Sequence, residues 1–490
     1  MGEDLTPFWA EFNGSLRIES RAERLTSEAG AVILREVMER LGVVPWMVER
    51  LRDPRDPRLI THPLAELLRT AVLLIAQGWR DRDDADALRD DAALRLAVST
   101  RRGISPLSNP EREEGAAPSK NPSVPEGLAS QPTLSRLVRE LASAENRTVL
   151  REALLETAAR RVKAGRGGHR MRYASIDVDG LPIDVHGHQS GSEYNGHYHS
   201  RIYHPIVASL AETGDLVDLR LREGNVHSAE GALEFVLSVV ERVEKKLCQV
   251  ASVRIDAGFP EENLLAGLEG RDTPTPYVAR VRNNAVLDRM AEPLLARPVG
   301  RPPKEPRTWI HEMSYQAESW SRPRRVVLVV MERQGELFLH HFWLITNWTE
   351  EQMPGDALLE LYRERGTAEG HYGELKSVLD PALSSSPRQK SHYRGEVPER
   401  RTAPGDAFAQ NEVILLLNAL AYNVAHAVRV LTEVATGEGW SLMRLRERVL
   451  RVAARVLVHG RRATLVIGKA SATLWHALWS QLITWRYAEG

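Results

Sequence analysis

Cysteine is almost absent from this chain of 490 residues. Cys248 is the single one, so one chain can form neither an internal disulfide nor a zinc site built from cysteine thiolates. A long unbroken apolar run is missing too. The longest, residues 413–431, is interrupted by two asparagines, a histidine and an arginine. This favours a buried helix over a membrane span, and we expect no membrane partner.

An excess of charge of one sign is also missing. The chain has 65 Lys and Arg residues and 66 Asp and Glu residues, so its net charge is −1. Binding follows local patches of charge rather than the sum, so this balance does not exclude a nucleic-acid partner. The first residues carry acidic side chains and no apolar segment typical of a secretory signal, so we expect a cytoplasmic protein.

Residues 1–165 are predicted to be α-helical, because apolar residues recur at helical spacing in several segments. Residues 101–129 are rich in Pro, Ser and Gly and are predicted to form a flexible loop. The last of these helices is predicted to begin at Ser130 or Thr133. Short helices joined in this way suit a helix-turn-helix DNA reader, but they equally suit a plain helical bundle.

The pattern changes at about Met171. Residues 166–282 predict three strands, then helix, strand, helix and strand, which indicates a mixed sheet with helices on its faces. Residues 283–354 begin with a proline-rich linker and contain a predicted hairpin that turns at Gln334-Gly335. Helix returns in residues 355–405 and dominates residues 406–490, where a short strand, RRATLVIG, interrupts it.

Residues 361–377, LYRERGTAEGHYGELKS, predict a helix with an unusual polar file. At about 100° per residue, four polar side chains fall within roughly 60° of one another. These four are Tyr362, Arg365, Glu369 and Lys376. An adjacent apolar file that can dock on a core consists of Leu361, Ala368, Leu375 and Leu379.

Three glycines lie on the other flank of this helix, at positions 366, 370 and 373. Each costs about 1 kcal/mol relative to alanine in a helix interior. We therefore expect another backbone, of protein or of DNA, to approach this flank.

Acidic residues also occur at the ends of two predicted strands. Alternation places Asp177 and Asp179 on one face of the first strand, and Asp256 ends the second. A lone aspartate at a strand end usually hydrogen-bonds the backbone of the turn that follows. Together with an acid on the helix, however, these residues make a hard oxygen site for Mg²⁺ or Mn²⁺. Two such ions would activate a water or a 3′-hydroxyl at a phosphodiester.

The spacing Tyr362-x2-Arg365-x3-Glu369-x6-Lys376 resembles the Y-R-E-K signature of bacterial DDE insertion-sequence transposases of the IS-four-like clan. Segments along nearly the whole chain resemble one branch, insertion-sequence family thirteen-eighty. These segments are DADALRDDAALRLA, LASQPTLSRL, DVDGLPIDVHGHQSG, VRIDAGF and NALAYNVAHAVR.

The resemblance implies an α/β catalytic core of RNase H-like (DDE) type, formed by residues 166–282 and 355–405 and interrupted by a β-rich insertion, residues 283–354. It implies a triad of Asp179, Asp256 and Glu369 that holds two Mg²⁺ or Mn²⁺ ions. Many relatives have threonine or serine two residues after the first aspartate, whereas this chain has Leu181. Asp177 therefore stays an alternative for the first position.

The same resemblance assigns contacts to the phosphates that flank the cleavage point. Tyr362, Arg365 and Lys376 would make them, Arg365 as a fork and Lys376 as a point charge. A helical N-terminal part, residues 1–165, would bind the terminal inverted repeats and dimerise. The whole would be a cut-and-paste transposase, a homodimer in its complex with double-stranded DNA (repeats and target), in the nucleoid of a bacterium.

Five histidines within residues 185–204 open an alternative. His-x-His on a strand places both rings on one face, as zinc or iron would need, but no acidic partner lies at a recognisable spacing. Phosphate or structural contacts are the preferred interpretation. The histidines are His186, His188, His197, His199 and His204. A further alternative is a DNA-binding regulator that keeps the transposase fold without activity, although intact acids argue against it.

Overall fold

The computed structural model describes residues 7–108, 127–185, 187, 189–297, 305–334, 336, 338–385 and 404–485. The chain folds into two compact units. Unit 1 is Met1–Arg40, Asp53–Leu137 and Ala427–Thr484, and unit 2 is Leu41–Arg52, Val138–His426 and Trp485–Gly490. These boundaries differ from the predicted segments, since residues 138–165 belong with the sheet that follows them. Residues 109–126 of the predicted loop lie outside the described residues.

The helices of unit 1 follow the predicted apolar spacing. They are α1 (Ala31–Leu41), the 3₁₀ turn η1 (Pro57–Leu59), α3 (Leu64–Gln77), α4 (Asp84–Ala87), α5 (Ala92–Val98), α6 (Gln131–Glu140), α14 (Leu442–Leu445), the π-helical turn η5 (Arg446–Leu450) and α15 (Lys469–Leu482). The segment DADALRDDAALRLAVS forms two helices rather than one, because the Asp91 carboxylate accepts a hydrogen bond from the Leu94 N–H at 2.9 Å and starts α5 there.

Unit 1 also contains strands, and those within residues 8–26 contradict the prediction that residues 1–165 are α-helical, whereas the predicted short strand RRATLVIG is confirmed. The strands are β1 (Phe8–Ala10), β2 (Asn13–Ile18), β3 (Leu25–Thr26), β15 (Ala454–His459) and β16 (Arg462–Ile467). β15 lies where a helix was predicted. It pairs with β16 in a hairpin that turns at Gly460 (φ 55°), and with β3 from the other end of the chain. Local spacing carries no information about such a distant partner.

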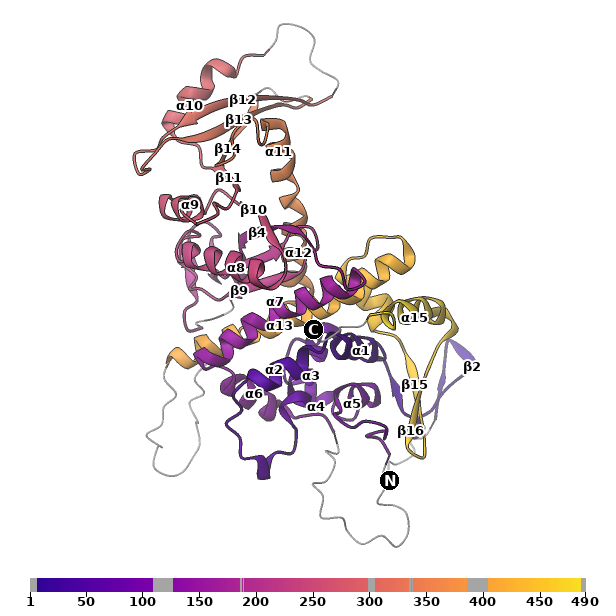
Figure 1. Ribbon diagram of the computed structural model, residues 1–490. Coiled ribbons are helices and arrows are strands. Elements are labelled where there is room, and N and C mark those ends of the chain that lie inside the picture. Colours follow the sequence, from indigo (N-terminus) through magenta and orange to yellow (C-terminus); the bar gives the residue numbers. More distant parts are fainter. Residues whose placement is uncertain are drawn as a thin grey trace. The chain divides into compact units, whose positions relative to one another are not determined.

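The centre of unit 2 is an eight-stranded sheet with the order β12-β13-β14-β11-β10-β4-β8-β9 (Figure 1). β4, β10 and β11 are parallel to one another, and every other neighbouring pair is antiparallel. The strands are β4 (Tyr173–Gly180), β8 (Ile206–Leu210), β9 (Leu216–Arg220), β10 (Gln249–Ile255), β11 (Tyr277–Val281), β12 (Arg307–Tyr315), β13 (Arg324–Glu332) and β14 (His340–Thr346). A second sheet has the order β5 (Ile183–Asp184), β7 (Ser200–Tyr203), β6 (Glu193–Asn195).

Helices and strands alternate from β9 to β11, as the sequence predicted. The helices of unit 2 are α2 (Val43–Arg50), α7 (Ala144–Gly165), α8 (Ala232–Lys246), α9 (Glu262–Glu269), α10 (Ala285–Ala291), the 3₁₀ turn η3 (Glu292–Leu294), α11 (Gly355–Arg363), α12 (Arg365–Glu374), the π-helical turn η4 (Leu375–Leu379) and α13 (Pro404–Thr436). α8 joins β9 to β10 and α9 joins β10 to β11. Ile176, Phe235, Val253 and Tyr277 from these strands and from α8 share one buried core.

Two details of the sheet differ from the predictions. The predicted strand HYHSRIYHPIVASL forms β7 and β8, which are separated at His204-Pro205 because proline has no N–H for a strand ladder. The predicted hairpin is β13 and β14, and Gly335 at its turn lies outside the described residues. β12 was not predicted. Since β14 pairs with β11, these three strands extend the central sheet itself.

α13 contains the longest apolar run. By length and composition alone, its residues 407–436 could cross a membrane, but 94% of the most apolar window is buried inside the protein. The Asn423 side chain within it bonds the Leu216 backbone, accepting from its N–H at 2.9 Å and donating to its carbonyl at 2.8 Å. The helix is therefore built as a core helix, as the polar interruptions predicted.

Candidate active site

The two strand-end aspartates lie beside each other. Asp179 is the penultimate residue of β4, and Asp256 follows β10 directly. The two strands are parallel, with Val178 opposite Ile255, so both carboxylates emerge at the same edge of the sheet. The Gly258 N–H also donates to the Asp256 carboxylate at 2.8 Å, so this residue serves its turn as well.

Glu369 is on α12, and Arg365, one turn earlier, connects it to the strands. The Arg365 guanidinium pairs with Asp179 (Nη2 to Oδ2, 2.6 Å) and also with the Glu369 carboxylate. Arg365 is buried, whereas the Glu369 side chain is 57% exposed. The structure therefore places Asp179 and Glu369 on either side of one guanidinium, and Asp256 is near enough for its charge to act on Asp179.

The electrostatics of the site are set first by the burial of Asp179 and then by the charged groups around it. Burial raises the pKa of Asp179 to about 7. The positive charge of Arg365 opposes this increase, and the negative charges of Asp256 and Glu369 add to it. A cation at this edge of the sheet would relieve the repulsion.

The raised pKa predicts how stability depends on pH in the metal-free protein. Asp179 ordinarily titrates near 3.8 when unfolded and near 7 when folded. Between these values the folded state binds more protons, so the free energy of unfolding falls as pH rises from about 4 to 7 and then levels off. The loss should reach at most about 4 kcal/mol. Chemical unfolding in EDTA would measure it, and Asp179→Asn should lose much less over this range.

Asp177 has a different environment from Asp179, although both side chains are on the same face of β4. Its carboxylate is only 1% exposed and forms a two-pronged ion pair with Arg254 of β10, at 2.6 and 2.7 Å. Arg254 also donates to the Leu361 carbonyl and to the Glu364 carboxylate, each at 3.0 Å. Asp177 thus attaches the glutamate helix to the sheet, and Asp179 remains the aspartate that meets Asp256 and Glu369.

The donor set fits Mg²⁺ or Mn²⁺ in its chemistry, because both ions prefer carboxylate oxygens. Asp179 and Asp256 lie at neighbouring ends of two paired parallel strands. In the described part of the chain no three carboxylate or imidazole groups lie close enough to hold one ion. The reason is local: the Glu369 carboxylate is turned to Arg365, so it would have to exchange this partner for the ion.

The helix that carries Glu369 is not one regular element. α11 ends at Arg363, α12 begins at Arg365, and the turn with Lys376 is π-helical. The apolar file predicted for it is buried, apart from Leu361, which is partly buried. Lys376 pairs with Asp184 at 3.2 Å, and Tyr362 is partly buried, which raises its pKa. Phosphate contacts by these residues and by Arg365 stay a prediction.

The three glycines of this helix face open space. A Cβ atom added at Gly366, Gly370 or Gly373 would meet nothing within 4 Å in the described structure. No described part of the protein backbone approaches them, contrary to one of the two expected explanations. The other explanation, a close approach by DNA, stays a prediction.

Sequence reasoning missed two residues that build the site. Arg254 was part of a strand pattern, and only its register opposite Asp177 reveals its partner. Tyr372 lies on α12, buried, and its hydroxyl is hydrogen-bonded to the Asp177 carbonyl (3.0 Å) and to Ser209 Oγ (2.7 Å). The file of buried residues that includes Ala368 and Leu375 could have suggested that Tyr372 faces inward.

The histidines do not form a metal centre among the described residues. His186 and His188 lie outside the described residues, and His197 and His199 are exposed. His204 is buried, and its Nδ1 is 3.0 Å from the Val226 carbonyl oxygen. The structural interpretation of this segment holds for His204.

Comparison with known proteins agrees with the class of protein that the site indicates. The fold is mixed α/β, with acidic residues from two adjacent strands and one helix. The chain matches the family model described as transposase DDE domain group 1 over residues 8–483. The chain therefore belongs to this family of DDE transposases.

Two further comparisons add little to this assignment. No curated protein matches the chain. Among solved structures, a cryo-EM structure of the piggyBac transposase synaptic complex with hairpin DNA is similar, with 10% sequence identity and a TM-score of 0.39. The similarity covers 92% of this chain and 80% of that chain. The family match alone carries the assignment.

Proposed function

We propose that the chain is a cut-and-paste transposase of an insertion sequence, related to insertion-sequence family thirteen-eighty. One observation supports this most: Arg365 pairs with both Asp179 and Glu369, and the charges of Asp256 and Glu369 both act on Asp179. The order of the sheet supports an RNase H-like core, since β9, β8 and β4 are antiparallel neighbours and the parallel strands β10 and β11 follow.

In the proposed reaction Asp179, Asp256 and Glu369 hold two Mg²⁺ or Mn²⁺ ions. Such ions, when bound, activate a water or a 3′-hydroxyl and stabilise the leaving oxygen at a phosphodiester. Arg365 pairs with the carboxylates on either side of it, and in the proposed complex it would also contact a phosphate as a fork. Tyr362 on α11 and Lys376 in the π-helical turn η4 lie on either side of it along the chain and would position the neighbouring phosphates.

The rest of the proposal concerns the DNA and the assembly. Residues 1–165 would bind the terminal inverted repeats and dimerise, and target DNA would be attacked by the freed 3′-hydroxyl. Residues 283–354 would be an insertion in the catalytic core, and 406–490 a C-terminal helical region. A bacterial, nucleoid-associated cytoplasmic location fits this function. The competing proposal is a DNA-binding regulator without activity.

A cleavage assay separates the two proposals. The purified protein is mixed with supercoiled plasmid that carries the gene's own flanking ends, in Mg²⁺ or in Mn²⁺. A transposase should release the segment between the repeats by cuts at the repeat ends, mapped by sequencing. Specific end binding without cutting, in both metals, would instead support the regulator.

The open glycine flank gives a second test. Gly370→Ala should raise the free energy of unfolding by about 1 kcal/mol, because alanine favours the helix and a Cβ meets nothing at this position. If DNA approaches this flank closely, the same variant should cut end-bearing plasmid more slowly. Thermal unfolding and cleavage rates measured together would show this opposite pair of effects. A variant that is more stable and equally fast would contradict the close approach.

A further inference from the structure

A basic segment without acidic residues joins α7 to β4 in unit 2. Residues 157–176 contain six Lys or Arg and no Asp or Glu. In a chain whose charges nearly balance, such a stretch is a local excess of positive charge. It is continuous with the strand that carries Asp179, so its position relative to the carboxylates is fixed within one sheet.

The arginines of this segment divide into a paired and a free group. Arg160 pairs with Glu156 at 2.5 Å, and Arg161 pairs with Asp215. The side chains of Arg166, Arg170 and Arg172 are exposed, and in the part of the chain that the structure describes they form no ion pair and no hydrogen bond. Most arginines around the sheet have such partners, so the fold does not use these three.

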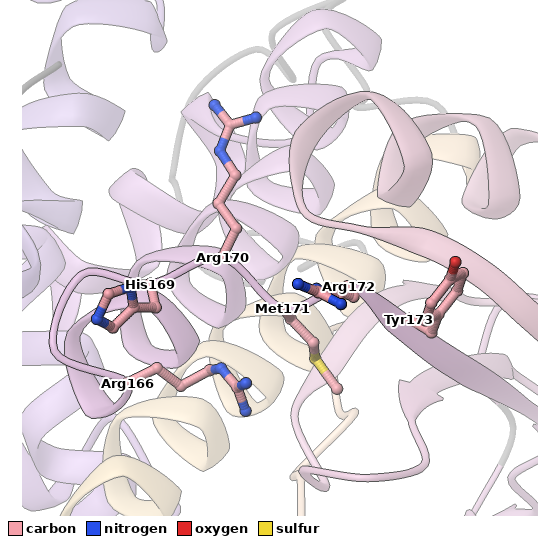
Figure 2. A pocket seen from close by; sticks show the side chains of 6 residues that line it. All are labelled: Arg166, His169, Arg170, Met171, Arg172 and Tyr173. Carbon is pink, nitrogen blue, oxygen red and sulfur yellow. The ribbon is translucent and has the colours of Figure 1, made fainter.

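The free arginines line a cavity of about 560 Å³, together with His169, Met171 and Tyr173. Figure 2 shows the side chains leaving one short stretch of backbone, with the guanidinium groups of Arg166, Arg170 and Arg172 pointing in different directions. The turn between Arg166 and Arg170 contains Gly167 and Gly168. Both have positive φ, and a Cβ atom added at either would meet nothing within 4 Å. A bulky partner therefore has room to approach.

We propose that Arg166, Arg170 and Arg172 bind the sugar–phosphate backbone of duplex DNA at a place separate from the carboxylate site. This inference rests on the proposed function and specifies where a further stretch of the DNA lies. A guanidinium presents a fork of donors that matches phosphate oxygens. Three forks that point in different directions cannot converge on one small anion, whereas successive phosphates of a duplex can meet them all.

The distance between this basic segment and the carboxylates follows from β4. Tyr173 begins the strand and Asp179 is six residues further along it, which corresponds to roughly 20 Å. At about 3.4 Å per base pair this is on the order of six base pairs of DNA. The arginines would thus bind the duplex several base pairs away from the phosphodiester that is cut. They would contribute to affinity without contacting the reacting bond.

The test is the salt dependence of binding to a labelled 40-base-pair duplex of random sequence, followed by fluorescence anisotropy from 50 to 300 mM KCl. The triple variant Arg166→Gln, Arg170→Gln, Arg172→Gln removes the three charges at exposed positions, so folding should be unaffected. Each lost phosphate contact reduces the slope of log K against log[salt] by about 0.9. We expect a slope smaller by about 2 to 3 and an affinity about 10- to 100-fold lower at 100 mM KCl.

A matched control removes the same charge from other exposed positions of unit 2. The triple variant Lys245→Gln, Arg289→Gln, Arg307→Gln should keep nearly the wild-type slope. If both triple variants lose equal affinity, or if the first keeps the wild-type slope, this inference fails while the proposed function stands. If the wild-type protein binds no duplex at all, both fail.

Discussion

Asp179→Asn, Asp256→Asn and Glu369→Gln should each reduce cutting of end-bearing plasmid at least about a thousandfold, because groups that act as one unit cannot substitute for one another. Each change removes a negative charge and keeps the size of the side chain. Asp179 and Asp256 come from adjacent parallel strands, and Glu369 of α12 shares its partner Arg365 with Asp179. Single-turnover cleavage rates in saturating Mg²⁺ would measure the loss.

Two variants make this prediction specific. Glu360→Gln changes an exposed glutamate of α11 that pairs only with Arg363 among the described residues, and it should cut at the wild-type rate. Asp177→Asn tests the alternative first ligand. Because the Asp177 carboxylate is already held by Arg254, this variant should lose stability rather than metal-dependent cutting. An active Asp179→Asn beside a folded but inactive Asp177→Asn would reverse the assignment.

Replacing Arg254 by leucine should lower the free energy of unfolding by about 3 to 5 kcal/mol, because it leaves a buried carboxylate without its partner. Asp177 is 1% exposed and Arg254 equally so. The change also removes the bonds from Arg254 to the Leu361 carbonyl and to Glu364, which connect the sheet to the glutamate helix. Urea unfolding followed by far-UV circular dichroism would measure the effect.

The double variant Arg254→Leu, Asp177→Leu distinguishes two contributions to the lost stability. One is the cost of leaving the Asp177 carboxylate buried without a partner, and the other is the loss of the bonds that Arg254 makes. A buried ion pair replaced by apolar side chains is often neutral in stability. We therefore expect the double variant to regain most of the stability that Arg254→Leu loses. A double variant as unstable as the single one would show that the bonds to the helix, rather than the buried charge, account for the loss.

The strands of unit 2 that carry the candidate aspartates were largely predictable from sequence. Alternation and length gave β4, β10 and β11, and the ends of β4 and β10 gave Asp179 and Asp256, because these features depend on neighbours along the chain. Glu369 followed from the helical file. The choice between Asp177 and Asp179 did not follow, since alternation places both on the same face. It depends on which arginine of the next strand lies opposite, and that is a matter of register.

The remaining differences have the same physical origin. β3 pairs with β15 from the far end of the chain, and β12 joins the central sheet through β13 and β14. Strand pairing between distant segments leaves no periodic signal in either of them. The pairing of Arg365 with two carboxylates was equally hidden, because the helical wheel gives directions around one helix and says nothing of what faces it.

The position of Arg365 has a consequence for how the protein can exist before it meets a substrate. A guanidinium between Asp179 and Glu369 acts as a built-in counter-ion, so the acidic residues can assemble during folding without waiting for an external cation. Removing divalent ions should then silence the enzyme and leave its architecture standing. A bound metal ion would then add stability to a fold that forms without it.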